Sequence, residues 1–89
     1  MPLVFGLLPA YPNPFNPKTT IAYQLPKAEF VNVTVYDIAG RQVASLVNEQ
    51  KAAGTYRLDW EPHTLASGIY LIRIKAGKFI AVQKCMMLK

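Results

Sequence analysis

Cysteine and histidine occur once each in this 89-residue sequence, and residues 62–89 contain no aspartate or glutamate. The single cysteine, Cys85, cannot form a disulfide within the chain, so cysteine usage does not identify a redox compartment. No Cys/His spacing fits a zinc site, and no acidic loop has the density of oxygen ligands that calcium needs. No uncharged run approaches the ~20 residues that a membrane-spanning helix requires. The sequence therefore predicts none of these features.

Length and composition predict one small folded domain. A domain of this size buries only roughly 60–65% of the surface of its unfolded chain, so a deep active-site cleft is not expected. The composition is 52% hydrophobic and only 17% charged, which is too apolar for a disordered tail. Residues 1–10 are apolar but contain no basic residue, which argues against a signal peptide. We expect residues 1–10 to be an upstream linker or an extra strand.

The positive charge is concentrated towards the C-terminus. Residues 1–61 contain five basic and five acidic residues, whereas residues 62–89 contain five basic residues and no acidic one. The formal net charge of +5 therefore lies in the last third of the chain, on Arg73, Lys75, Lys78, Lys84 and Lys89. We predict that the C-terminal hairpin is a cationic surface.

Hydrophobic and polar residues alternate at period two along most of the chain, which predicts β-strands. Glycines and prolines separate six predicted strands, at residues 19–26, 30–37, 41–48, 55–61, 69–75 and 78–88, with a seventh candidate at residues 2–8. Residues 49–54 are predicted as a loop. The pattern predicts an all-β fold, an immunoglobulin-like antiparallel β-sandwich of about seven strands with Trp60 at its centre.

Four of the seven prolines fall within residues 9–17, directly before the first clear strand. Each proline fixes its own φ near −65° and pushes the preceding residue towards extended geometry, so this segment cannot be helical. Asn13 and Asn16 each precede a proline, and their short side chains can cap turns. We predict a stiff arm that leads into the sandwich.

Candidates for catalysis are weak. Asp59 and Glu61 lie about 6.6 Å apart by strand rise, which is superficially a glycosidase spacing, but acids at alternate positions usually form a solvated face and no cleft is predicted. A dyad of His63 and Ser67 is disfavoured because a lone loop imidazole is usually solvated and the Ser-Gly turn explains Ser67. Cys85 is predicted as a packing thiol, reactive only if it is exposed beside lysines. We predict no enzymatic activity for this domain.

The basic hairpin has several interpretations. Nucleic-acid binding is disfavoured because a net charge of +5 is modest and no reading element is present. Docking on an acidic protein or on an anionic glycolipid surface is a stronger hypothesis. The alternative is a solubilising strand face whose lysines protect a sheet edge.

Five sequence blocks follow one another along the chain. They are Tyr11-Pro-Asn-Pro-Phe-Asn-Pro-Lys-Thr-Thr-Ile-Ala-Tyr-Gln-Leu-Pro26, Val33-Thr-Val-Tyr-Asp-Ile-Ala-Gly-Arg41, Ala53-Gly-Thr-Tyr56, Leu65-Ala-Ser-Gly-Ile-Tyr70 and Lys84-Cys-Met-Met-Leu-Lys89. In this order they resemble the blocks of the type IX secretion C-terminal sorting domain, type A, over about residues 8–89. The outline is also similar to the immunoglobulin-like domain of flagellar hook-capping proteins, which shares the fold more than the purpose. The apolar segment Leu3–Leu8 stands where the family leads us to expect a polar linker.

The resemblance implies a non-catalytic module at the C-terminus of a larger exported protein of a Bacteroidetes-type bacterium, with residues 11–89 as the sorting domain. It implies that the outer-membrane secretion machinery reads the domain, which is often cleaved afterwards, and that the cargo is released or fixed to anionic lipopolysaccharide. It also implies that residues 68–89 carry most of the address. Together with the charge pattern, this predicts seven partner-recognition residues, namely Gly68, Tyr70, Arg73, Lys75, Lys78, Lys84 and Lys89. We expect no cofactor, no nucleic-acid partner and no transmembrane segment.

Other functions stay open at this point. An accessory glycan- or protein-binding module of an extracellular hydrolase would use Tyr11, Phe15 and Tyr36 as an aromatic platform. A small enzyme would need a pocket lined by the acidic residues or the histidine discussed above. An unprotected last strand also makes an edge-strand dimer a candidate.

Overall fold

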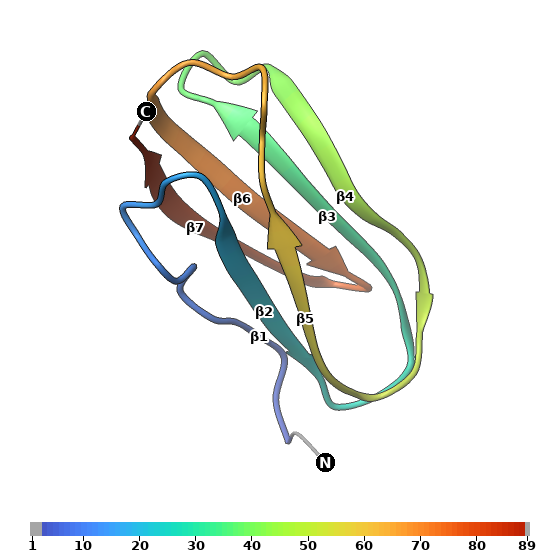
Figure 1. The fold of residues 1–89 in the computed structure, drawn as a ribbon. Helices are drawn as coiled ribbons and strands as arrows, with labels where there is room; N and C mark the ends of the chain where they lie inside the picture. Colours follow the sequence, from blue (N-terminus) through green and yellow to red (C-terminus); the bar gives the residue numbers. More distant parts are fainter. Residues whose placement is uncertain (1–2, 89) are drawn as a thin grey trace.

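The computed structural model describes residues 3–88, which form seven strands in two antiparallel sheets packed face to face (Figure 1). The smaller sheet has the order β1-β2-β5, with β1 (Gly6–Leu7), β2 (Thr19–Leu25) and β5 (Gly54–Trp60). The larger sheet has the order β4-β3-β6-β7, with β4 (Gln42–Lys51), β3 (Glu29–Asp37), β6 (Gly68–Ala76) and β7 (Phe79–Met87). The predicted antiparallel β-sandwich is confirmed.

Alternation along the strands decides which side chains form the core. In β2 and β3 every second residue points between the sheets, and the apolar residues at these positions are Ile21, Tyr23, Leu25, Val31, Val33 and Val35. Each of the six is at most 1% exposed. Because burying an aliphatic side chain of this size is worth roughly 1.5–3 kcal/mol, these alternating positions account for much of the stability of the fold.

Trp60 packs between two other aromatic rings in the core. Its ring centroid lies 5.5 Å from that of Phe15 and 5.9 Å from that of Tyr70, the latter in an edge-on arrangement. The central position predicted for Trp60 is confirmed, since the side chain belongs to the buried cluster and is 6% exposed. Phe15 comes from the proline arm and is only 1% exposed, so the arm is part of the sandwich and does not merely lead into it.

Tyr70 fixes the loop that leads into β6. Its hydroxyl donates a hydrogen bond to the carbonyl oxygen of Ala66, four residues earlier, at 2.6 Å. A tyrosine near the start of the sixth strand that bonds back to the preceding loop is the tyrosine corner of immunoglobulin-like sandwiches. The buried ring and this hydrogen bond explain why a tyrosine is needed at this position.

Two predicted turns form as hairpin loops. In the β3–β4 turn the Oδ1 atom of Asp37 accepts hydrogen bonds from the backbone N–H groups of Ala39 and Arg41, and the bond from Arg41 is the main reason that the pKa of Asp37 lies below its usual value. In the β6–β7 turn Gly77 has φ of 60°, which disfavours a side chain, and an added Cβ would lie 2.8 Å from the carboxylate of Glu29.

The loop predicted at residues 49–54 is wrong in part. Residues 49–51 continue β4 because they pair with residues 29–31 of β3, and Gly54 already begins β5. Long-range pairing overrides the weak local preference of this segment. The candidate strand at residues 2–8 contains β1, which pairs with β2 at Gln24 and Tyr23, whereas residue 2 lies outside the described residues.

Candidate docking surface

Basic residues lie on the outer face of the larger sheet, and none of the described strand positions on this face is acidic. The register places on it Gln42, Ser45, Asn48 and Gln50 of β4, Phe30, Asn32, Thr34 and Tyr36 of β3, Ile69, Leu71, Arg73 and Lys75 of β6, and Ile80, Val82, Lys84 and Met86 of β7. We call the β6 and β7 residues of this set, together with Lys78 in the turn between them, the cationic face. Directly opposed residues interact most strongly in a sheet, and on this face no base is opposed by an acid.

No basic residue of the cationic face takes part in a salt bridge among residues 3–88. The salt bridges that the structure contains join Lys18 to Asp59, Lys27 to Glu29, Arg41 to Asp37 and Lys51 to Glu49. All of these bases precede residue 62. The charges of Arg73, Lys75, Lys78 and Lys84 are therefore not neutralised by salt bridges among the described residues, and they can attract an acidic surface over about 10 Å at 0.1 M salt.

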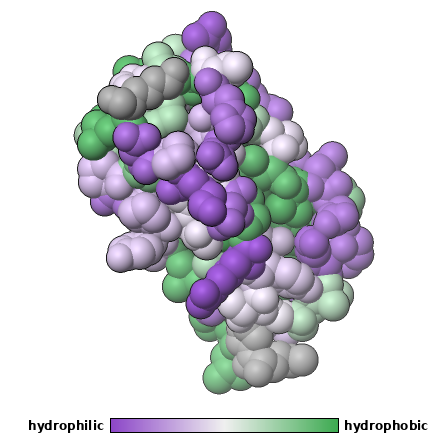
Figure 2. All heavy atoms as spheres, in the orientation of Figure 1, coloured by the Kyte–Doolittle hydropathy of each residue, from purple (hydrophilic) through white to green (hydrophobic). Residues whose placement is uncertain are grey.

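The other side of the molecule carries charge of both signs. Arg57 and Asp59 alternate on the outer side of β5, and Asp59 accepts a hydrogen bond from the Thr20 hydroxyl at 2.8 Å and lies 3.7 Å from the Lys18 ammonium. Figure 2 views the molecule from this side and shows hydrophilic residues running across it between smaller hydrophobic areas. The two outer faces of the sandwich therefore differ in charge.

Arg73 is held close to a neighbouring strand. Hydrogen bonds from the side chains of Thr34 and Arg73 lower the pKa of Tyr36, as does the charge of the guanidinium. Arg73 lies directly opposite Thr34 in the register, and Tyr36 lies two positions further along β3 on the same face. The contact orients the guanidinium along the outer face.

Exposed apolar side chains lie among these cations. On β7, Ile80 is 52% exposed, Val82 is 51% exposed and Met86 is 38% exposed. All three point outward because the alternate residues of β7, including Cys85 and Met87, point into the core. The cationic face thus combines apolar and basic side chains, which suits a protein or amphiphile partner.

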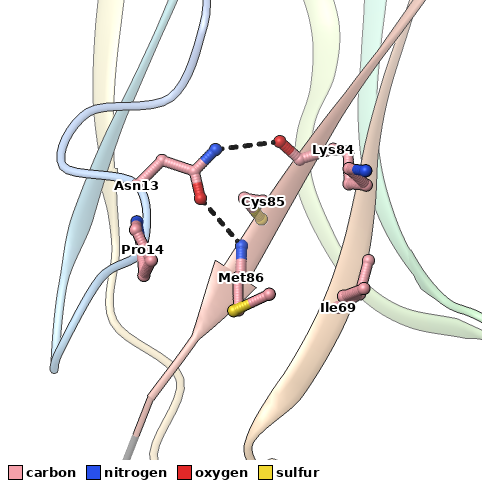
Figure 3. Close-up of a pocket in the computed structure, with 6 residues that line it drawn as sticks. All are labelled: Asn13, Pro14, Ile69, Lys84, Cys85 and Met86. Carbon is pink, nitrogen blue, oxygen red and sulfur yellow. Dashed lines mark hydrogen bonds between the residues drawn. The ribbon is translucent and has the colours of Figure 1, made fainter.

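The proline arm covers one end of the free edge of β7 (Figure 3). The amide of Asn13 donates to the carbonyl oxygen of Lys84 at 3.1 Å and accepts from the N–H of Met86 at 2.9 Å. Phe15 then donates its N–H to the carbonyl oxygen of Met86 and accepts from the N–H of Leu88, both at 2.9 Å. Between the arm and the strand lies an open hollow of about 210 Å³, lined by Asn13, Pro14, Ile69, Lys84, Cys85 and Met86.

Four of the predicted partner-recognition residues, Arg73, Lys75, Lys78 and Lys84, lie together on the cationic face. Gly68 begins β6 and pairs with Met87, so it lies at the far end of this hairpin. Tyr70 is 6% exposed and points into the core, so a direct contact with a partner through its side chain is not available in this fold. Lys89 lies outside the described residues.

Sequence reasoning missed the role of Asn13 and the exposure of Ile80 and Val82. The exposure of Ile80 and Val82 could have been predicted from the sequence, because in a strand they point to the face opposite to that of Cys85 and Met87. Asn13 had none, since its partners are more than 70 positions away.

Of the residues considered for catalysis, Asp59 is engaged and Cys85 is buried, whereas Glu61 and His63 are exposed. Asp59 is held by Thr20 and Lys18, as described above. Cys85 is 1% exposed, and burial raises the pKa of its thiol to about 11, which agrees with a packing role. Within residues 3–88 no group of three or more His, Cys, Asp or Glu residues is arranged to hold a metal ion.

The aromatic platform expected for a glycan-binding module does not form. Phe15 is 1% exposed because its ring packs against Trp60, whereas Tyr11 is 79% exposed. Phe15 is therefore not accessible to a glycan, and the three aromatic rings cannot act together as a platform.

The fold and the surface together define a small antiparallel β-sandwich domain with one cationic outer face. Comparison with known families identifies it further: residues 9–88 match the family of the secretion system C-terminal sorting domain, and the chain belongs to that family. It is a type IX sorting signal, a non-catalytic kind of module, which directs export across the outer membrane to the cell surface or the medium and interacts with the secretion machinery. No curated protein and no solved structure matched the chain. Within residues 3–88 there is no helix long and apolar enough to cross a membrane.

Proposed function

We propose that this chain is the C-terminal module of a larger exported protein, that it brings this cargo to the type IX translocon, and that it docks there through the cationic face. The observation that carries the proposal is the absence of an acidic partner for Arg73, Lys75, Lys78 and Lys84 among the described residues. A surface of one sign attracts a partner of the opposite sign and increases the rate of encounter.

The fold supports this role because it holds the basic residues Arg73, Lys75 and Lys84 on two regular, paired strands, β6 and β7. The two strands that carry the signal are paired with each other from Gly68–Met87 to Ala76–Phe79 without a register shift. β6 also pairs with β3, so the hairpin is anchored to the rest of the sandwich. The basic side chains therefore have fixed spacing, which a translocon component can recognise by charge and shape.

Attachment of the cargo after export is a further part of the proposal. A face with basic side chains and no acidic ones suits the phosphate groups of anionic lipopolysaccharide as well as an acidic protein. The parent protein, whether a hydrolase, a peptidase or an adhesin, would contribute the activity, and this module its destination.

The test is export of a fluorescent reporter fused upstream of residue 1, in a bacterium that has a type IX secretion system. Removal of residues 78–89 should leave the reporter in the periplasm, and continued export would refute the proposal. Because this deletion also removes β7 from the sheet, a second pair of variants keeps the fold. Arg73→Gln with Lys75→Gln should reduce export, whereas Lys18→Gln with Arg57→Gln, which removes the same charge from the opposite face, should not.

A further inference from the structure

Part of the edge of β7 carries backbone groups that no residue of the described chain satisfies. The N–H and C=O groups of Met86 both point away from β6, since they bond to Asn13 and Phe15 of the arm. In a regular antiparallel pair this orientation recurs at every second residue, and β6 and β7 pair without a register shift. The N–H and C=O groups of Ile80 and Val82 therefore also point away from β6, and they have no partner within residues 3–88.

The other half of the same edge shows that it accepts an extended chain. Asn13 and Phe15 make hydrogen bonds to Lys84, Met86 and Leu88, and Phe15 forms a bridge with Met87. The arm stops there. Beside residues 79–83 the segment that precedes the arm approaches β7 without pairing its backbone to it: the Gln83 side-chain amide donates to the carbonyl oxygen of Leu7 at 3.2 Å, and the Phe79 ring stacks on that of Phe5 at 5.2 Å. The outward-pointing backbone groups of Ile80 and Val82 stay open at the edge. An incoming strand would continue the row of hydrogen bonds that the arm begins.

The side chains at the open half indicate what kind of strand fits. Ile80 and Val82 present two exposed apolar side chains on the outer face. A basic residue lies at each end of this pair: Lys78 in the turn, and Lys84 at the point where the arm first contacts β7. A strand with two apolar residues at alternate positions and an acidic residue on each side would match this order.

A second copy of this chain fits poorly. In the antiparallel register that sets Ile80 of one copy opposite Val82 of the other, Lys78 of one copy would stand opposite Lys84 of the other. Like charges directly opposite each other destabilise a sheet. The charge pattern therefore disfavours the edge-strand dimer and favours an acidic partner.

We propose that the edge of β7 from Lys78 to Lys84 is a strand-docking site, which binds an extended acidic segment of a partner protein by adding it to the larger sheet. This inference rests on the proposed function, because it names the mode by which the cationic face engages the secretion machinery. Main-chain hydrogen bonds would supply affinity, and the two flanking lysines would select acidic over basic segments.

The first experiment uses two synthetic peptides, Glu-Thr-Val-Thr-Val-Thr-Glu and Lys-Thr-Val-Thr-Val-Thr-Lys, titrated into the 15N-labelled chain. We expect the acidic peptide to shift the amide resonances of Ile80, Val82 and Lys84 and to bind at least roughly tenfold more tightly than the basic one, since two cross-strand charge pairs change sign. Equal binding of both peptides, shifts centred on β4, or no binding would overturn the proposal. A dimer formed through β7 at the same concentrations would also overturn it.

The second experiment removes one backbone donor. Val82→Pro deletes an N–H that points away from β6, so the β6–β7 ladder keeps its bonds, whereas Val82→Thr keeps the donor with a side chain of similar shape. The acidic peptide should lose at least roughly tenfold in affinity for Val82→Pro and keep its affinity for Val82→Thr. Loss in both variants, or in neither, would count against a main-chain contact. If Val82→Pro does not fold, the peptide pair on the unaltered chain decides the question.

Reporter export separates the two proposals. If deletion of residues 78–89 stops export but a folded Val82→Pro fusion is exported normally, strand docking is wrong and the sorting function stands. If the deletion leaves export intact, the proposed function itself fails. Loss of export in Val82→Pro, with normal export in Val82→Thr, would support both.

Discussion

The N–H group of Met86 in the last strand donates a hydrogen bond to the side-chain oxygen of Asn13, 73 positions earlier, at 2.9 Å. The side-chain NH2 group of Asn13 also donates a hydrogen bond to the carbonyl oxygen of Lys84, so this one side chain satisfies two backbone groups of an edge strand. Edge strands with unpaired backbone groups are exposed to unwanted pairing. The proline arm thus stabilises and protects the C-terminal end of the sorting signal.

Replacement of Asn13 by alanine should weaken this end of β7. Both backbone groups would lose their partner but would remain near solvent, so we expect a loss of about 1–2 kcal/mol in the free energy of unfolding, measured by urea denaturation. The amide of Met86 should also exchange its hydrogen faster. Asn16→Ala is the matched control, because Asn16 belongs to the same arm and makes no hydrogen bond within residues 3–88. An equal loss in both variants would contradict the role assigned to Asn13.

The strands were predictable because period-two alternation is a local property of the sequence. Val31, Val33 and Val35 could be assigned to the core without knowing what they contact. The packing of the arm could not be predicted, since the burial of Phe15 depends on Trp60, which is 45 positions away, and the role of Asn13 depends on the last strand. Prolines indicated the stiffness of the arm but not its neighbours.

Tyr70 provides a test of the fold that is independent of secretion. Tyr70→Phe removes a 2.6 Å hydrogen bond to the carbonyl oxygen of Ala66 in a partly buried place, so we expect a loss of about 1–1.5 kcal/mol in unfolding free energy. Tyr56→Phe is a matched control, because the Tyr56 hydroxyl bonds in the same way to Ala52, at 2.7 Å, but in an exposed place. The loss of unfolding free energy in Tyr56→Phe should be smaller, because water can replace the hydroxyl at this exposed place. A larger loss for Tyr56→Phe would contradict the tyrosine corner.

The candidate site was predictable in composition but not in shape. Counting charges along the chain identified the four basic residues of the cationic face, Arg73, Lys75, Lys78 and Lys84. That this face lacks acids follows only from the register, which places neutral residues such as Asn32 and Thr34 opposite Lys75 and Arg73. The sequence blocks also pointed to Tyr70, whose buried ring serves the fold, because a block shared by a family does not distinguish a structural residue from a contact residue.

The thiol of Cys85 should make stability depend on pH in the alkaline range. Its pKa is about 11 in the folded chain against an ordinary value of 9.0, so folding favours the neutral thiol. The stabilisation is therefore complete below pH 9 and is lost as the pH rises towards 11, by roughly 2–3 kcal/mol in all. Comparison with Cys85→Ala isolates this effect, because lysines and tyrosines titrate in both proteins. The difference in unfolding free energy between them should shrink from pH 8 to pH 11, and a constant difference would contradict the assignment.

Lys75→Gln should leave stability unchanged or raise it slightly. Lys75 lies opposite Asn32 and Ile80, with Arg73 two positions earlier on the same face, so its charge is repelled by its neighbours and attracted by none of them. We expect a gain of a few tenths of a kcal/mol at low salt, which disappears at 1 M salt, where the Debye length is only about 3 Å. Lys51→Gln is the control for a lysine with close partners, because Lys51 lies 2.7 Å from the Glu49 carboxylate and 5.1 Å from the centre of the Tyr56 ring. This substitution should destabilise the fold. If Lys75→Gln destabilises the fold as much, its charge serves the fold and not a partner. A gain in stability together with a loss of export would mean that the basic side chain is retained for recognition at some expense to folding.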